Sequence, residues 1–297
     1  MTSVPGLVIE QDGALLRIAF DRPGKRNSLT DDMVAGLTDV IQAAGNDESV
    51  RAVLLAGTGE HFCSGFDIVA RNAGADDSAT RGGDPPSPPS ATRGGERSNP
   101  PSPPSPPRRL RAGSIQRRLP GQAHRLIPVL LETQVPIVAA VRGWAAGIGL
   151  AFALAADVTV ASRTATFWAP FSSRGFTPDS GVSWLLPRRV GEVRARKMLL
   201  LGEKVDGATA ADWGMIDRCV PDDQLEQQAE EVAQQLAGSA TVAIGLTKML
   251  MHVGHDATLQ AQLRNEAFAM ELSSRSEDFK EGLAAFAHKR PTQFTGR

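Results

Sequence analysis

The chain of 297 residues has little cysteine, no excess of either charge and no long apolar run. Its only cysteines, Cys63 and Cys219, cannot form a disulfide framework, so we expect a reducing, cytoplasmic environment. The 32 basic and 33 acidic side chains leave a net charge of -1, which argues against a nucleic-acid-binding protein. The longest uncharged apolar run, residues 143–156, is shorter than the roughly 20 residues of a membrane span. Residues 1–6 show no secretion signal, so we expect neither a membrane protein nor a secreted one.

The remaining composition is that of a globular protein, with 41% hydrophobic and 22% charged residues, except in one segment. Between Asp84 and Pro107 lie 10 of the 20 prolines, in Pro-Pro-Ser repeats without large aliphatic side chains. Such a composition cannot offset the entropy of ordering, so we expect a disordered surface insertion at about residues 74–107. A ligand for a proline-recognising domain is the alternative. The arginine-rich residues 108–118 behind it are expected to be a solvated helix entrance, with a phosphate contact as the other interpretation.

The other segments alternate between strand and helix patterns. Strands are predicted at residues 14–20, 51–56, 136–141 and 157–161. Helices are predicted after the N-cap Thr30, up to Glu132, and at residues 149–156, 192–200, 223–237, 256–270 and 276–288. We therefore predict an α/β core over residues 1–220 and a helical region over residues 221–297.

Two loops could carry chemistry. The glycine-rich turn at residues 143–149 joins a strand to a helix, where backbone N–H groups favour an anion. It lacks the third glycine and the later acidic residue of a dinucleotide-binding fingerprint, and taken alone it favours a tight connection. The loop at residues 57–68 has the same strand-to-helix setting. Two such loops can each direct one N–H at a single oxygen, which is how enzymes stabilise an enolate.

Five motifs together resemble the crotonase superfamily, the enoyl-CoA hydratase/isomerase family. They are residues 21–29 (Asp-Arg-Pro-Gly-Lys-Arg-Asn-Ser-Leu), 62–68 (Phe-Cys-Ser-Gly-Phe-Asp-Ile), 141–149 (Val-Arg-Gly-Trp-Ala-Ala-Gly-Ile-Gly), 175–181 followed by 186–191, and 277–282 with 286–291. The resemblance covers nearly the whole chain apart from the insertion. It implies a crotonase-type spiral of ββα turns with a helical C-terminal trimerisation region, assembled as a homotrimer or a dimer of trimers.

The resemblance also implies a site and a substrate. The backbone N–H groups of Phe66 and Ile148 would form an oxyanion hole for the thioester carbonyl of an acyl-CoA, and Trp144 and Phe171 would lie near the acyl group. Residues matching the coenzyme A contacts are Lys25, Arg26, Ser28, Ser64, Asp67 and Ile68. Coenzyme A would enter as part of the substrate, with no separate cofactor and no metal, and the role would lie in lipid or fatty acid metabolism.

The sequence departs from the hydratases of this family at both catalytic glutamates, which are replaced by Ala151 and Phe171. Neither side chain can accept a proton from water, so we expect standard hydration to be very weak. Asp179 instead matches a catalytic aspartate of double-bond isomerases and of an aryl-CoA dehalogenase. Loss of solvation beside Trp168, Phe171 and Trp184 would make its carboxylate a stronger base.

Alternatives remain open at this stage. Asp179 is equally suited to be a helix N-cap, and His124 is the only histidine in the region where the dehalogenase branch has a catalytic one. Double-bond isomerisation is the first choice of reaction, with enoyl-CoA hydration or a catalytically silent acyl-CoA-binding subunit as alternatives. His252 and His255 are expected to be a helix-surface pair, because no third metal ligand is near them in sequence.

Overall fold

The computed structural model describes residues 3–68, 117, 121 and 123–297. The insertion expected at about residues 74–107 lies outside the described residues, and so does the arginine-rich stretch apart from Arg117. The expectations for these segments therefore stay predictions.

A six-stranded sheet forms the centre of the fold, in the order β1-β2-β3-β4-β6-β9. Its strands are β1 (Leu7–Asp12), β2 (Leu15–Phe20), β3 (Ala52–Gly57), β4 (Ile137–Val141), β6 (Val158–Ser162) and β9 (Arg218–Val220). β1 pairs with β2 in antiparallel fashion, whereas the later pairs are parallel. All five residues of β4 are buried, as expected for an apolar strand covered on both faces. The four predicted strands are confirmed to within one residue at either end.

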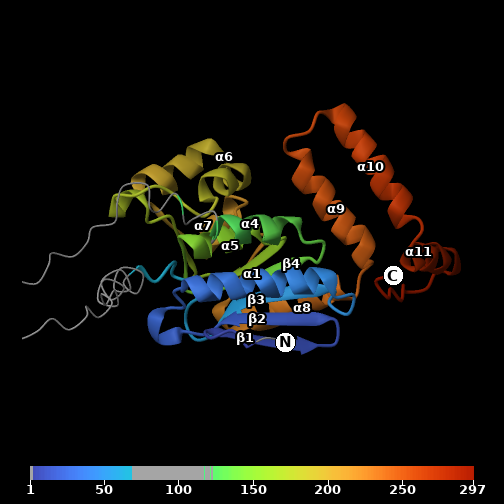
Figure 1. The fold of residues 1–297 in the computed structure, drawn as a ribbon, viewed down its shortest axis with the longest axis horizontal. Coiled ribbons are helices and arrows are strands. Elements are labelled where there is room, and N and C mark those ends of the chain that lie inside the picture. Colours follow the sequence, from blue (N-terminus) through green and yellow to red (C-terminus); the bar gives the residue numbers. More distant parts are fainter. Residues whose placement is uncertain (1–2, 69–116, 118–120, 122) are drawn as a thin grey trace, which may run out of the picture.

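Three helices and the main hydrophobic core cover one face of this sheet: α1 (Asp31–Asn46), α4 (Ala123–Glu132) and α5 (Ile148–Ala155) (Figure 1). The Thr30 hydroxyl accepts a hydrogen bond from the Met33 N–H at 3.2 Å, which confirms the predicted N-cap of α1. Met33 and Leu37 on the inner side of α1 pack into the same core as Leu16 and Leu55 of the sheet. The amphipathic spacing of α1 therefore places it on the sheet.

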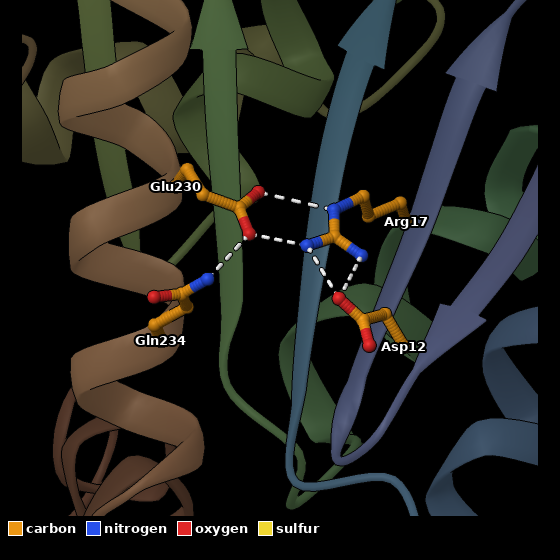
Figure 2. A network of polar contacts seen from close by, with 4 residues as sticks. All are labelled: Asp12, Arg17, Glu230 and Gln234. Carbon is orange, nitrogen blue, oxygen red and sulfur yellow. Dashed lines mark hydrogen bonds and ion pairs between the residues drawn. The ribbon is translucent and has the colours of Figure 1, made fainter.

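The opposite face is covered by α8 (Leu225–Ala237), whose Leu225, Ala229 and Val232 belong to a second core with strand residues such as Val138. Figure 2 shows the polar edge of this contact, where Arg17 of β2 binds both Glu230 of α8 and Asp12, while Gln234 donates to Glu230. The boundary predicted at residue 221 stays a prediction, but the helical region behind it does not lie wholly outside the core. Its first helix completes the core, because the sheet needs apolar cover on this face.

A second, three-stranded sheet of β5 (Trp144–Ala146), β7 (Thr166–Trp168) and β8 (Lys204–Asp206) lies beside α6 (Val182–Leu201) and α7 (Gly207–Asp212). The helix predicted at residues 192–200 is the second half of α6. The backbone of α6 is bent at Gly191, where φ is 76° and ψ is 162°. Short 3-10 turns lie at η1 (Pro23–Lys25), η3 (Ser172–Arg174) and η4 (Asp222–Gln224).

The last three helices extend away from the sheet: α9 (Thr241–Gly254), α10 (Leu259–Ser273) and α11 (Glu277–His288) (Figure 1). α10 packs on α9, and both predicted helices in this region are confirmed, whereas α9 as a whole was not predicted. Within the described ranges no single helix is long and apolar enough to cross a membrane. Among the described helices, α8 with its preceding turn and α9 reach that length and hydropathy only when taken together, across a bend of 105°.

Candidate active site

The loop after β3 is held between the N-terminal segment at residues 26–29 and strand β5. Leu29 N–H donates to Gly65 O at 2.9 Å, and on the other side Cys63 N–H donates to Trp144 O at 2.8 Å. Isolated bridges pair Leu29 with Phe66 and Cys63 with Ala145. The fold thus brings together three segments that lie far apart in the sequence.

Two glycine turns meet where the predicted oxyanion residues begin. Gly65 and Gly147 have φ values of 108° and 58°, which L-residues with a side chain rarely adopt. A β-carbon on Gly147 would lie 3.7 Å from the Gly65 Cα, and Ala146 N–H donates to Cys63 O at 2.9 Å, so the two turns lie close together. Phe66 and Ile148 directly follow these glycines. Ile148 is the first residue of α5, and its N–H therefore has no acceptor within the helix.

Buried Asn27 fixes the turn that precedes the oxyanion loop. It has a left-handed φ of 55°, and its side chain satisfies three backbone groups. Its Oδ1 accepts from Arg22 N–H at 2.8 Å, and its Nδ2 donates to the carbonyl oxygens of Thr58 at 2.9 Å and His61 at 2.6 Å. Sequence reasoning assigned no role to Asn27, although it lies inside a quoted motif; a buried asparagine between turn residues was the available signal.

The Arg22 side chain ties the same turn to the oxyanion loop. Its guanidinium forms an ion pair with Asp67 at 2.9 Å and donates to Ser28 O at 2.6 Å. Ser64 N–H donates to Arg26 O at 3.1 Å. The residues predicted to contact coenzyme A therefore lie on two adjacent segments: Lys25, Arg26 and Ser28 on one, and Ser64, Asp67 and Ile68 on the other. Lys25, Arg26 and Ile68 are exposed.

The positions of the two hydratase glutamates are apolar and buried. Ala151 is fully buried in α5, and Phe171 is 2% exposed with its ring edge-on to Phe176 at 5.7 Å. The nearby thiol of Cys63 is also buried, and this burial raises its pKa to about 12, so it is not a nucleophile at neutral pH. None of these three side chains can transfer a proton to or from a substrate.

The two aromatic residues expected near the acyl group have different surroundings. Trp144 is half-buried on β5, where Lys204 Nζ lies 5.3 Å from its ring centre and 5.0 Å from that of Trp168. Phe171 is part of the main core. Among the described residues, neither Trp144 nor Phe171 lines the cavity that contains Asp179.

Asp179 lines a cavity of about 420 Å³ between α4 and the start of α6, and its side chain accepts from the Ser180 hydroxyl at 2.8 Å. The Asp179 carbonyl oxygen accepts from His124 Nε2 of α4 at 2.7 Å. The N-cap of α6 is Gly181, and no side chain caps this end, so the alternative that Asp179 is an N-cap is wrong. Of its three expected apolar neighbours, only Trp184 lines the same cavity.

Three further titratable residues line this cavity: His124, Glu132 and His252. The rings of His252 and His255 lie edge-on to Trp184, at 6.2 Å and 5.8 Å between centres. His252 is half-buried and His255 exposed, so the two histidines lie at the surface as expected and in addition flank a tryptophan. No group of three or more potential ligands that could hold a metal ion is found in the part of the chain that the structure describes.

The two glycine turns, the adjacent N-terminal segment and the parallel strands all lie in the part of the chain that a family model matches. The family model described as Enoyl-CoA hydratase/isomerase matches residues 10–84 and 113–297. The chain belongs to the enoyl-CoA hydratase/isomerase family. Members of this family form the crotonase superfamily, so the predicted fold class is confirmed. The unmatched residues 85–112 contain most of the proline-rich segment.

Similar proteins of this family carry different reaction names. The chain is 34% identical over 283 residues to 1,2-epoxyphenylacetyl-CoA isomerase of Escherichia coli, covering 95% of each protein. It is 27% identical over 291 residues to 2,3-dehydroadipyl-CoA hydratase of the same organism, covering 98% of the chain and 99% of that protein. Among solved structures, an enoyl-CoA hydratase from Polaromonas sp. JS666 superposes with a TM-score of 0.80 at 26% identity, over 97% and 99% of the two chains.

Proposed function

We propose that this protein binds an acyl-CoA thioester, stabilises its enolate and moves a carbon–carbon double bond. The close approach of the two glycine turns at Gly65 and Gly147 supports this proposal, because Phe66 and Ile148 directly follow these glycines. The thioester carbonyl oxygen would accept from Phe66 N–H and Ile148 N–H. As the enolate forms, negative charge grows on this oxygen, and fixed donors stabilise that charge without reorganising.

In the proposed reaction Asp179 is the base and then the acid. Its carboxylate takes a proton from one carbon of the acyl group, the electrons move into the enolate, and Asp179, which can exchange its proton with solvent, returns a proton at the carbon two positions away. No oxidant, water or metal enters this balance. Three observations support Asp179: its half-buried position, its place in the cavity wall and the absence of a capping bond. One relative is named an isomerase of an acyl-CoA, although the substrate in its name is an epoxide.

Hydration is less well supported by the residues of the site, although several relatives are named hydratases. Water addition needs a group that accepts the proton of the attacking water. Ala151 and Phe171 are buried and apolar where such groups would be needed. The same observation favours the second candidate, a subunit that binds acyl-CoA without turning it over.

Binding of coenzyme A and self-assembly complete the proposal. The exposed Lys25 and Arg26 suit the phosphates of coenzyme A, which would enter as part of the substrate rather than as a separate cofactor.

A homotrimer or a dimer of trimers is proposed because the last three helices expose many large apolar side chains. These are Met251, Val253, Leu259, Leu263, Phe268, Met270, Leu272, Leu283 and Phe286.

The test is turnover of a β,γ-enoyl-CoA to its conjugated α,β isomer, followed at the absorbance of the conjugated thioester. Asp179→Asn should lower turnover about 100-fold or more, because the amide cannot accept the proton. Asp39→Asn, at an exposed position of α1, is the matched control and should keep full turnover. Full turnover in Asp179→Asn would refute the proposed mechanism. Acyl-CoA binding without turnover in the unmutated protein would favour the silent subunit.

A further inference from the structure

A second cavity, of about 280 Å³, adjoins the one that contains Asp179. The two share four lining residues, Leu131, Trp184, Leu185 and His252, so they are neighbouring parts of one groove between α4, α6 and α9. The shared wall is largely apolar. A ligand that reaches past Asp179 along this wall therefore enters the second cavity.

The second cavity has a net positive lining. Its basic residues are Arg188, Arg189 and Lys248, whereas Asp157 is the only acidic one among the described residues that line it. Asp157 is already paired with Lys248, whose Nζ lies 2.7 Å from its Oδ2. If the charges of Asp157 and Lys248 cancel, the cavity lining keeps the two positive charges of Arg188 and Arg189.

Neither arginine forms an ion pair with a buried carboxylate among the described residues, although the charge of Asp157 is shared between Lys248 and Arg189. Arg189 donates to the carbonyl oxygens of Leu154 and Ala156 at the end of α5, at 3.1 Å and 2.8 Å. Arg188 is 3.9 Å from Asp256, but that carboxylate is 81% exposed, and exposed pairs are strongly screened by water. The far end of the groove thus offers two guanidinium charges.

Trp184 holds Arg188 in place at this end. The guanidinium carbon of Arg188 lies 3.8 Å from the Trp184 ring centre, and its Nη1 donates to Trp184 O at 3.2 Å. The rings of His252 and His255 pack edge-on against the same tryptophan. A planar guanidinium fixed on an aromatic ring is suited to bind a carboxylate with two parallel hydrogen bonds.

The distance between the proposed oxyanion hole and the second cavity determines how long an acyl chain must be to reach this cavity. Ile148 begins α5 at the proposed oxyanion hole, and Leu154, Ala155 and Ala156 at its other end line the second cavity. Eight helical residues span about 12 Å at 1.5 Å per residue. A carboxylate at the end of a short acyl chain would not reach this cavity, whereas one at the end of a longer chain would.

We infer that this protein selects acyl-CoA thioesters whose acyl chain ends in a carboxylate, which Arg188 and Arg189 bind in the second cavity. This inference rests on the proposed function, because it places the acyl chain in the groove beside Asp179. It adds a class of substrate, the CoA thioesters of medium-length dicarboxylic acids, and two residues that determine specificity.

Binding of saturated acyl-CoA pairs tests the inference without any turnover. Dissociation constants are measured by calorimetry for octanedioyl-CoA against octanoyl-CoA, and for succinyl-CoA against butyryl-CoA. The eight-carbon diacid should bind about 10-fold or more tightly than its neutral partner, since a hydrogen bond to a charged group contributes on this scale. The four-carbon pair should show no such preference. Equal binding of the eight-carbon pair would overturn the inference and leave the proposed isomerase reaction standing.

Variants of α6 identify the residue responsible. Arg188→Gln should abolish the preference for the eight-carbon diacid, and Arg188→Lys should keep part of it. Arg196→Gln is the matched control, because Arg196 is an exposed arginine of the same helix that pairs with Glu192. A preference unchanged in Arg188→Gln, or an equal loss of affinity for all four ligands as expected of a contact with the coenzyme A phosphates, would overturn the assignment. Failure of every acyl-CoA to bind the unmutated protein would refute the proposed function as well.

Discussion

The ion pair between Lys248 of α9 and Asp157 joins the C-terminal helices to the core. Lys248 is only 9% exposed, and its Nζ donates to Asp157 Oδ2 at 2.7 Å and to the carbonyl oxygens of Leu130 at 2.9 Å and Val135 at 3.4 Å. His252, four residues later on α9, lines both cavities of the groove. The position of His252 in the groove therefore depends on the ion pair between Lys248 and Asp157.

Burial works against both charges of the pair. It raises the pKa of Asp157 above its ordinary 3.8 and lowers the pKa of Lys248 below its ordinary 10.5, and in each case the partner opposes the shift. The contribution of Asp157 to stability is thus complete below pH 3.8 and is lost as the pH rises through its raised value. That of Lys248 is complete above pH 10.5 and is lost as the pH falls through its lowered value. At neutral pH both charges are desolvated and depend on each other.

Removal of one partner should therefore be costly. Lys248→Met should lower the free energy of unfolding by about 3 kcal/mol, the lower end for a broken buried pair, because Asp157 keeps a quarter of its side chain exposed. Adding Asp157→Asn should restore most of this loss, since no buried charge remains and the amide oxygen still accepts from Ile137 N–H. Arg275→Gln, which breaks an exposed pair with Glu271, is the control and should cost about 0.5 kcal/mol or less.

Urea unfolding at one fixed protein concentration measures these differences, because the stability of an assembly depends on concentration. The reasoning would be refuted if Lys248→Met cost less than about 1 kcal/mol. It would also be refuted if the double variant were no more stable than Lys248→Met alone.

Three further outcomes are expected. Hydration of crotonyl-CoA should stay far below the about 10 s⁻¹ usual for enzymes, because both hydratase glutamate positions are apolar; turnover at that rate would contradict this account of the site. Hydrogen bonds from Arg290 and, second, from Gln293 N–H lower the pKa of Glu281 from 4.5 to about 2, so this contact should hold the C-terminal segment above pH 4.5 and be lost as the pH falls through 2; in Arg290→Gln an NMR titration should find the pKa of Glu281 raised toward its ordinary value, and an unchanged pKa would refute the assignment. In Gly149→Ala the added carbon would lie 2.3 Å from Cys63 O, so the free energy of unfolding should fall by about 1–3 kcal/mol, whereas Gly282→Ala, with its nearest neighbour at 3.7 Å, should not lose stability.

Local patterns predicted the elements whose signals are themselves local. Thr30 could be predicted as an N-cap because a hydroxyl directly before an amphipathic run commonly accepts a hydrogen bond from a backbone N–H of the first helical turn. The strands of the central sheet are short apolar runs bounded by turns, which is sufficient to predict buried parallel strands. The family could be recognised because its motifs are spread along the chain in a fixed order.

Features that depend on packing between distant segments were not predictable in this way. α8 has the pattern of any amphipathic helix, and only the uncovered face of the sheet decides that it belongs to the core. Aspartate is a residue type that often caps helices, but the N-cap of α6 is Gly181, which has a left-handed φ of 74°. Similarly, nothing in the spacing of His252 and His255 indicates that they flank Trp184, which lies on another helix.

Proton exchange at the α-carbon of a bound acyl-CoA tests the central claim most directly, because it reports enolate formation without a completed reaction. Octanoyl-CoA is incubated with the protein in deuterated water, and loss of the α-proton signal is followed by NMR. The unmutated protein should exchange this proton, and Asp179→Asn should exchange it about 100-fold more slowly at similar acyl-CoA affinity. Exchange at the full rate in Asp179→Asn, or no exchange in an unmutated protein that binds octanoyl-CoA, would contradict the account.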